Sequence, residues 1–361
     1  MSQRTKDIGA SDRRKRHDSA VTLATVAAAV GVSRMTVSNA YNRPDQLSPE
    51  LRERVLATAG RLGYAGPNPV ARTLSRGETG SIGLVLDYPL TVAFTDPATV
   101  QFLHGVAAGC ELEGLGLSLV PRIEGGGAEL VHKALVDGFV VYCVLQRDSR
   151  MDAIRSRQLP YVRVDFDPDP GLLDVNIDDE GAARSVAEHL GGLGHRRFGI
   201  ALPHDINGPF GPDAERSYWN HVCRARLAGW RAGLEAAGVD WSTVPVAGGP
   251  GKMRDSGRVA GGRLLDRARR PTAIIALSDV VALGVMDAAA ERGISMPSEL
   301  SVAGFDDVPE AAAADPPLTT IRQPHRTKGS EAVRLLLEGP EAESVLLPTE
   351  LVVRASTAPT P

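Results

Sequence analysis

The first periodic stretch of the chain has apolar side chains at helical spacing. In LATVAAAV, four apolar residues recur at positions i, i+3, i+4 and i+7, which places them on one face of a helix. They are Leu23, Val26, Ala27 and Val30. Thr22 can cap the start of this helix, and Gly31 can end it through a positive φ. The pattern predicts a short helix that buries one face.

Two further helices are predicted directly after it. Ser33 can cap a second helix, whose inward-facing residues would be Val37, Ala40 and Tyr41. The segment NRPDQLSPE then breaks the chain, and Ser48 with Pro49 can start a third helix. The inner face of the third helix would comprise Leu51, Val55, Leu56, Ala59 and Leu62. A helix, a tight glycine turn, a second helix and a supporting helix predict a helix-turn-helix unit.

The second helix of this unit is short and polar. In a helix-turn-helix unit this helix lies in the DNA major groove, with its first residues at the base edges. On this interpretation its outward side chains are long or polar because they would meet DNA; they are Arg34, Met35, Ser38 and Asn39. The alternative, which the pattern alone leaves open, is a small helical domain that binds another protein.

A linker is predicted after this unit. The chain reads AGPNPVARTLSRGETG, and the Gly, Pro and Asn at its start are typical of a linker. Within it, PVARTLSR is weakly amphipathic. A helix of eight residues is marginal alone in water, so this segment would need a partner helix or DNA to order it.

From Ser81 onward, apolar strand-like runs alternate with helical stretches. The runs are SIGLVL, LSLVP, GFVVYCVL, YVRVDF, RFGIAL, TAIIALS and LSVAGFD. Near-continuous apolar strands separated by helices predict parallel sheets covered by helices on both faces. About 280 residues are enough for two such subdomains, and a ligand site is then expected between them, at the carboxyl ends of the strands.

Composition and charge narrow the function classes. The 361 residues are 43% hydrophobic and 23% charged, which is typical of a globular protein. The apolar runs are far too short for a membrane span, the N-terminus lacks the apolar stretch of a secretory signal, and three separated cysteines fit a reducing cytosol. Residues 1–76 carry 13 Lys/Arg and 6 Asp/Glu, a net charge of +7, whereas the remaining residues carry −11. This asymmetry suggests that one end meets a polyanion, although a solvated basic arm would show the same excess.

The same segments resemble a known family. VTLATVAAAVGVSRMTVSNAYNRPDQLSPE closely resembles the N-terminal signature of LacI/GalR-family transcriptional regulators. The resemblance continues through HLGGLGHRRFGIA, ALSDVVALGVMDAAAERG, PPLTTIRQP and PTELVVRAST, and it extends over residues 21–357. The family implies an all-α helix-turn-helix headpiece, a hinge helix, and an α/β core of two parallel-sheet subdomains that is periplasmic-binding-protein-like. It also implies a homodimer whose DNA affinity changes when a small molecule binds in the core.

The resemblance implies boundaries along the chain. The expected segments are a basic flexible arm at 1–20, the headpiece at 21–67, the hinge helix and linker at 68–80, and the effector-binding and dimerisation core at 81–361. Within the core, one subdomain is expected at about 81–177 and 325–345, and the other at about 178–323 and 346–357.

The family reads bases mainly with the two residues after the serine of its GVS motif, here Arg34 and Met35. Arginine can donate two hydrogen bonds to guanine, whereas methionine offers apolar contact, for instance to a thymine methyl. Asn39 could pair with adenine or bond a phosphate. In the hinge, Leu74 matches the leucine that wedges between base steps, with linker packing as its alternative role. The full expected DNA-binding set is Thr22, Ser33, Arg34, Met35, Thr36, Ser38, Asn39, Asn42, Arg72, Leu74 and Arg76, on a near-palindromic operator.

The resemblance also implies an effector site. Its expected residues are Asp165, Arg226, Ser278, Asp306, Gln323 and, as a weaker match, Phe94. Carboxylates, a guanidinium and an amide around a cleft suit a polyol, because each hydroxyl can both donate and accept. For Asp306 and Asp279 the alternative role is helix or loop capping.

Two departures from the family concern the effector. The segment AGGPGKMRDSG lacks the aromatic residue that usually stacks on a sugar, and Lys252 or Met253 could take its place. A lysine there could favour an anionic effector such as a phosphosugar, or it could point to solvent. The segment 203–223 is also longer than expected, and its His204, Asp213 or Trp219 could fold over the cleft.

Other chemistry is not indicated. GGPGKM fails the phosphate-loop pattern, because methionine follows Lys252 where serine or threonine is required. His189 and His195 are six residues apart, the wrong spacing for metal ligands on one helical face, and no nucleophile elbow is present. We therefore expect no enzyme activity, no cofactor and no metal. A sugar-binding transport protein would share the core, but the helix-turn-helix segment tells against it. The expected function is that of a cytoplasmic, ligand-responsive transcriptional regulator, a repressor of a carbohydrate-related operon.

Overall fold

The computed structural model describes residues 21–66, 77–123, 127–203, 220–250 and 253–360. The chain divides into two compact units, Met1–Thr79 and Gly80–Pro361. The predicted hinge helix falls almost entirely on residues outside the described ranges.

The first unit contains the predicted helix-turn-helix. Its helices are α2 (Leu23–Val30), α3 (Arg34–Asn42), the short 3-10 turn η1 (Pro44–Gln46) and α4 (Pro49–Leu62). The side chains of Thr22, Ser33 and Ser48 cap the three α-helices, as predicted. Gly31 ends α2 with a φ of 75°, a left-handed conformation that favours glycine.

The three helices share one apolar core. Its fully or almost fully buried members are Val26, Ala27, Val37, Ala40, Val55 and Ala59. All six lie on the predicted inner faces. The prediction was wrong for Leu62, which is 36% exposed. Leu62 is the last residue of α4, where the chain turns away at Gly63, so the buried stripe ends one turn earlier at Ala59.

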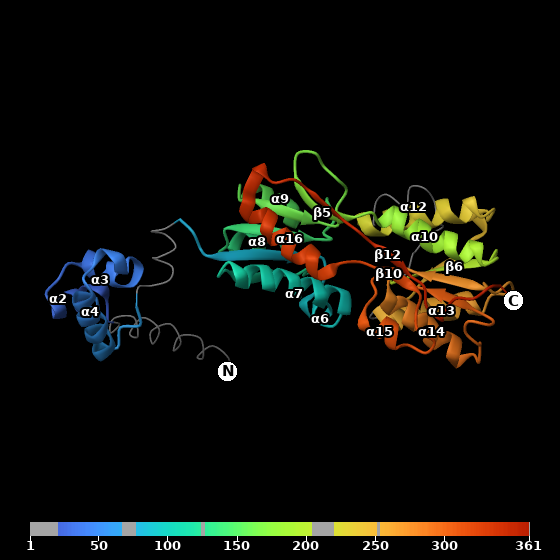
Figure 1. Cartoon of the computed structure of the whole chain (residues 1–361), viewed down its shortest axis with the longest axis horizontal. Helices are drawn as coiled ribbons and strands as arrows, with labels where there is room; N and C mark the ends of the chain where they lie inside the picture. Colours follow the sequence, from blue (N-terminus) through green and yellow to red (C-terminus); the bar gives the residue numbers. More distant parts are fainter. Residues whose placement is uncertain (1–20, 67–76, 124–126, 204–219, 251–252, 361) are drawn as a thin grey trace, which may run out of the picture. The chain divides into compact units, whose positions relative to one another are not determined.

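The second unit holds two parallel sheets, each with helices on both faces (Figure 1). The N-subdomain sheet has six parallel strands in the order β11-β5-β4-β3-β1-β2. These are β1 (Ser81–Leu86), β2 (Gly116–Val120), β3 (Gly138–Tyr142), β4 (Tyr161–Val164), β5 (Leu173–Ile177) and β11 (Val345–Leu347). One face is covered by α7 (Pro97–Leu112) and α16 (His325–Glu338), and the other by α8 (Gly127–Lys133) and α9 (Ser149–Ser156). The short helix α6 (Leu90–Ala93) follows β1, and the turn η3 (Gly339–Glu341) follows α16.

The C-subdomain sheet has four parallel strands in the order β7-β6-β8-β9. These are β6 (Phe198–Leu202), β7 (Val246–Gly248), β8 (Ala273–Ala276) and β9 (Ser301–Ala303). One face carries α10 (Asp179–Gly192) and α12 (His221–Ala236), and the other carries α13 (Met253–Leu265) and α14 (Asp279–Glu291). The remaining elements are η2 (Trp241–Thr243), α15 (Pro309–Ala313) and the antiparallel pair β10 (Thr320–Arg322) and β12 (Glu350–Val352).

Three described connections join the two subdomains. The chain leaves the N-subdomain between β5 and α10, returns between β10 and α16, and leaves it again between β11 and β12. The last N-subdomain strand runs to Leu347, two residues beyond the expected end of that segment at 345. Polar groups at these three connections can therefore act on both subdomains.

All seven predicted apolar runs contain strands, but the pattern missed β5, β7, β10, β11 and β12. In β5 the reason is visible in its side chains. Asp174 and Asn176 are buried where an apolar residue was expected, and each has a partner: Asp174 accepts two hydrogen bonds from Arg163, and Asn176 bonds the backbone of Phe166. Pairing lets polar residues occupy an inner strand.

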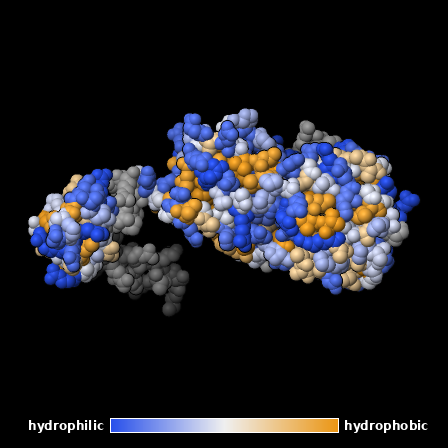
Figure 2. Space-filling model, in the orientation of Figure 1, coloured by the Kyte–Doolittle hydropathy of each residue, from blue (hydrophilic) through white to orange (hydrophobic). Residues whose placement is uncertain are grey.

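The surface of the second unit carries apolar patches set among hydrophilic residues (Figure 2). Across the described segments, no helix has the length and apolarity needed to cross a membrane.

Candidate DNA-binding and effector sites

The first turn of α3 presents its side chains outward. Ser33 caps the helix by accepting a hydrogen bond from the Thr36 backbone at 3.0 Å. Val37 and Ala40 are buried against the other two helices, so the opposite face points away from the core. Arg34 is exposed and Met35 is 70% exposed. Both side chains are therefore accessible to a partner molecule.

Other predicted DNA-contacting side chains are tied to their own helix or its surroundings. Ser38 accepts a hydrogen bond from Asn42 at 3.2 Å, and Asn39 donates to Gln46 at 3.1 Å. Thr22 forms a capping box with Thr25. These contacts hold the helix and leave Arg34 and Met35 as the outward pair. Three further predicted residues, Arg72, Leu74 and Arg76, lie outside the described residues.

Four of the six predicted effector residues meet between the two sheets. They are Asp165, Arg226, Asp306 and Gln323, and all four are buried. Asp165 follows β4, Asp306 follows β9 and Gln323 follows β10, so strand ends deliver three of them. Arg226 comes from α12. Asp165 and Asp306 thus lie just beyond the carboxyl ends of parallel strands, the place where the sequence analysis expects a ligand site, whereas Gln323 follows a strand of the antiparallel β10–β12 pair.

Arg226 is held on several sides. Its Nε donates to Asp179 Oδ1 at 2.8 Å, and its Nη1 donates to the Leu277 carbonyl at 2.7 Å. The guanidinium lies over the ring of Phe305, and Nη1 is 3.7 Å from Asp306 Oδ1. Although burial alone would lower it, the pKa of Arg226 is raised by Asp179 and Asp306. The cation is fixed in place before any ligand arrives.

Asp306 is held on its other side by Gln323, whose Nε2 donates to Asp306 Oδ1 at 2.6 Å. Asp306 adopts a φ of 124°, a conformation that favours glycine. Burial raises the pKa of the Asp306 carboxyl well above its usual range, against the opposing effect of Arg226. Strained backbone of this kind at a buried polar group is typical of a functional site.

Sequence reasoning missed Lys328, which is 1% exposed. Its Nζ donates to Asp165 Oδ1 at 2.5 Å and to Gln323 Oε1 at 2.7 Å. Burial raises the pKa of Asp165, and Lys328 opposes that shift. The signal was available, because Lys328 lies at helical spacing from Ala332 and Leu335 on the buried stripe of α16.

Two more buried groups of the site were missed. Asp179 Oδ2 and both ring nitrogens of His325 have no hydrogen-bond partner among the described residues. Burial lowers the pKa of His325 well below its usual range, with further lowering by Lys328 and Arg226, so the ring is neutral near neutral pH. A buried polar atom without a partner is costly, which makes these atoms candidates for contact with a ligand.

The structure places three other residues differently. Ser278 caps α14 by accepting a hydrogen bond from the Val281 backbone at 3.4 Å, next to the carbonyl that Arg226 uses. Phe94 is 58% exposed directly after α6 and does not join the buried cluster. Asp279 accepts hydrogen bonds from Thr320 and from the Val308 backbone, so its loop-capping alternative describes it well.

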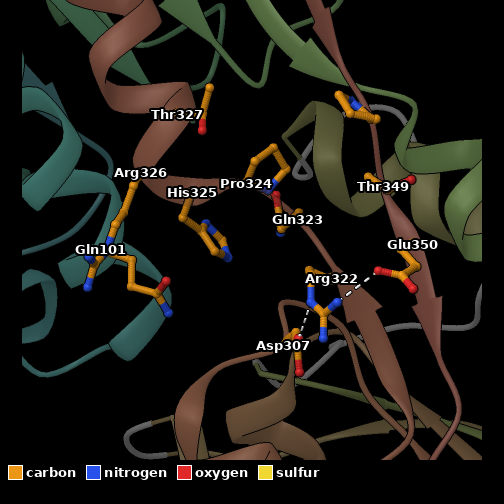
Figure 3. Close-up of a pocket in the computed structure, with 11 residues that line it drawn as sticks. Gln101, Asp307, Arg322, Gln323, Pro324, His325, Arg326, Thr327, Thr349 and Glu350 are labelled. Carbon is orange, nitrogen blue, oxygen red and sulfur yellow. Dashed lines mark hydrogen bonds and ion pairs between the residues drawn. The ribbon is translucent and has the colours of Figure 1, made fainter.

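A pocket of about 530 Å³ lies beside the connections between the subdomains (Figure 3). Gln323 and His325 line it, together with Gln101 of α7 and Glu350 of β12. In Figure 3 an ion pair joins Arg322 to Glu350 across the β10–β12 ladder at 2.8 Å. The pocket and the buried cluster therefore share the segment that runs from β10 into α16.

Several other predictions fall outside the described residues or concern core packing. His204, Asp213, Trp219 and Lys252 are not described, whereas Met253 starts α13. His195 is fully buried and hydrogen-bonded through both ring nitrogens, to Thr272 and Ser301, which explains its presence without a metal. The described ranges contain no group of three or more His, Cys, Asp or Glu side chains that could hold a metal ion.

Family models match both units of the chain. Residues 22–68 match the lacI family of bacterial regulatory proteins, and residues 187–357 match a periplasmic binding protein-like domain.

Similar proteins span nearly the whole chain. An HTH-type transcriptional regulator of Mycobacterium tuberculosis is 45% identical over 94% of this chain and 97% of its own length. The HTH-type transcriptional repressor CytR of Escherichia coli is 30% identical over 96% of this chain and 99% of its own length.

Solved structures show the same architecture. The lac repressor dimer bound to operator is 28% identical, with a TM-score of 0.76 over 94% of this chain and 99% of that chain. The complex of the regulator CelR with cellobiose is 30% identical, with a TM-score of 0.67 over 93% of this chain and 99% of that chain. These likenesses extend across the headpiece and the core, and the similar curated proteins are regulators rather than enzymes. The chain is a DNA-binding transcriptional regulator of the lacI family.

Proposed function

We propose that this regulator is a repressor whose operator affinity is set by a neutral polyhydroxyl effector, bound between the two core subdomains. The observation that carries the proposal is the buried polar chain from Asp165 through Lys328, Gln323 and Asp306 to Arg226. Its fixed donors and acceptors, together with Asp179 Oδ2 and the His325 ring nitrogens next to it, which lack a hydrogen-bond partner in the described part of the chain, suit hydroxyl groups that can donate and accept.

The charge of the cluster favours a neutral ligand over a phosphorylated one. Three buried carboxylates, Asp165, Asp179 and Asp306, face two cations, Arg226 and Lys328. Burial already disfavours negative charge at this site, since it raises the pKa of Asp165 and Asp306, and a phosphate would bring further negative charge into the same surroundings. The cellobiose bound by CelR is a neutral sugar, in keeping with this preference.

On the DNA side, we propose that Arg34 reads a guanine in each half of a near-palindromic operator and that Met35 adds apolar contact. The exposure of both side chains supports this role. Two copies of the chain would form a homodimer in the cytoplasm, and apolar patches on the core offer surface that such a dimer could bury (Figure 2). Leu74 would wedge between base steps, with Arg72 and Arg76 at the groove or the phosphates.

Effector and operator binding would be reciprocal. If the effector changes operator affinity by some factor, the operator must change effector affinity by the same factor. CytR, which is similar to this chain over nearly the whole length of both proteins, is a transcriptional repressor by name. This similarity supports a repressor role here.

Sequencing of the genomic fragments that the full-length protein retains at moderate salt tests this function. The expected result is a near-palindromic motif whose occupancy changes when a pool of neutral sugars is added and does not change with the corresponding phosphorylated pool. The Arg34→Ala variant serves as the control and should lose the guanine preference at one position of each half of the motif. A response confined to the phosphorylated pool would overturn the neutral effector, and an unchanged motif for the control, guanine included, would overturn the reader role of Arg34.

A further inference from the structure

Buried cations in this core are arginines, with one exception. The whole chain has only five lysines, and the structure describes two of them, Lys133 and Lys328. Lys133 is exposed, whereas Lys328 is as deeply buried as Arg150 and Arg163. Lysine loses its charge more readily than arginine when buried, and it binds as a compact point charge rather than a planar fork. A lysine at this depth therefore calls for a specific explanation.

The contrast with Arg163 supplies one. Arg163 forms a bidentate pair with Asp174, with both bonds at 2.7 Å, and both residues belong to the N-subdomain sheet. Lys328 divides its donors between Asp165, in the N-subdomain, and Gln323, which follows the C-subdomain ladder. A planar guanidinium suits one carboxylate, whereas an ammonium can direct separate N–H groups to two unrelated partners.

Lys328 moves with the N-subdomain, because α16 is locked to α7. A Cβ added to Gly105 would come within 1.9 Å of the Arg326 carbonyl, and one added to Gly329 within 2.4 Å of the Phe102 carbonyl. The backbones of α7 and α16 are thus in direct contact near Lys328. A side chain at Gly105 or Gly329 would force the two helices apart.

Gln323 is held by the C-subdomain. It directly follows β10, and the neighbouring Ile321 carbonyl accepts a hydrogen bond from the Asp306 backbone at 2.8 Å. Its own amide holds Asp306. The Lys328–Gln323 hydrogen bond therefore spans the connection from β10 to α16, where the chain passes from one subdomain to the other.

We propose that Lys328 is the positioning residue that couples the two subdomains, by joining Asp165 on one side to the Gln323–Asp306 pair on the other. A shift of one subdomain against the other must make or break the Lys328–Gln323 bond, because each partner is fixed to a different body. This inference rests on the proposed function only in taking the cluster as the effector site. Two of the three N–H groups of Lys328 have described acceptors, which leaves the third for an effector oxygen.

Hydrogen–deuterium exchange on the full-length protein, without effector, tests the coupling. The variant is Lys328→Met with Asp165→Asn, so that no carboxylate is left buried without its cation. Amides of residues 319–327 should exchange on the order of fivefold faster than in the wild type, the effect of losing about one net hydrogen bond. Gln323→Leu, which leaves the Lys328–Asp165 pair intact, should accelerate the same amides.

The matched control is Arg163→Met with Asp174→Asn. This pair is equally buried but lies wholly within the N-subdomain, so it should accelerate exchange in β4 and β5 and leave 319–327 unchanged. The proposal would be overturned if the control accelerated exchange of amides 319–327. It would also be overturned if neither test variant accelerated their exchange. Because no effector is present, a wrong effector class cannot produce either result.

Discussion

The guanidinium of Arg226 lies over the ring of Phe305, with its central carbon 3.5 Å from the ring centroid. A cation over an aromatic face is attracted to it, and the attraction grows when water is excluded. The guanidinium also donates hydrogen bonds to Asp179 and to the Leu277 carbonyl, so it is held by the ring and by these two acceptors together. The Phe305 ring therefore helps to position the Arg226 cation within the buried polar cluster.

Removing this guanidinium should destabilise the core strongly. Arg226→Met keeps the length of the side chain but leaves Asp179 and Asp306 buried without a cation. We expect the free energy of unfolding at neutral pH to fall by about 3–5 kcal/mol, measured by urea denaturation. The control on the same helix is Arg231→Met, which breaks an exposed pair with Glu235 and should cost at most about 1 kcal/mol. Equal losses for the two variants would contradict the buried network.

Arg34 should determine operator affinity at one base pair of each half-site. Arg34→Ala should weaken binding to the retained operator by about 1–3 kcal/mol per site and relax the preference at that base pair. Fluorescence anisotropy with operator variants measures both effects. Arg54→Ala removes the same charge from the exposed side of α4 and should weaken binding to all sequences alike. A uniform loss for Arg34→Ala would reduce its role to phosphate contact.

Replacing Leu74 should affect operator binding through DNA bending, and it should leave the stability and effector binding of the core unchanged. We expect Leu74→Ala to weaken specific operator binding by roughly tenfold, because the added contacts of a bent duplex are lost. Thermal unfolding of the core and effector binding should remain as in the wild type. Unchanged operator affinity would remove the wedge from the mechanism.

Asp279 should give the core a distinct pH dependence. Burial raises the pKa of Asp279 from 3.8 to about 6, so the folded chain holds this proton more tightly than the unfolded chain. The stabilisation is complete below pH 3.8 and is lost as the pH rises through about 6, a change of about 3 kcal/mol.

The neutral side chain of Asp279→Asn removes this dependence. Relative to the variant, the wild type should lose stability between pH 4 and pH 7 in urea denaturation. Asp255→Asn, on the exposed side of α13, provides the control and should follow the wild type across the range. Parallel stability curves for the wild type and Asp279→Asn would show that Asp279 does not titrate in this window.

The features that could be predicted from the sequence are those with a regular spacing of apolar residues. The buried positions of the headpiece, such as Val37 and Ala40, and the apolar strands of both sheets follow directly from spacing. Caps such as Ser33 were equally readable, because the residue types that satisfy free backbone N–H groups are few.

What escaped prediction depends on partners distant in the sequence. No strand was predicted at β5, since its buried Asp174 pairs with Arg163 and this pairing could not be assigned without the sheet order. Lys328 was not singled out from the sequence, because its partner Asp165 lies 163 residues away. Phe94 was expected at the site only as a weaker match to the family, and in the structure it lies exposed at the end of α6.

The order of the strands also has a consequence for synthesis of the protein. Among the described residues, the apolar core of the headpiece is formed entirely by residues up to Tyr64. The N-subdomain instead needs α16 and β11, whose last residue is Leu347, so its sheet can close only when translation is almost finished. A nascent chain thus carries a folded DNA reader well before it has a core that can respond to an effector.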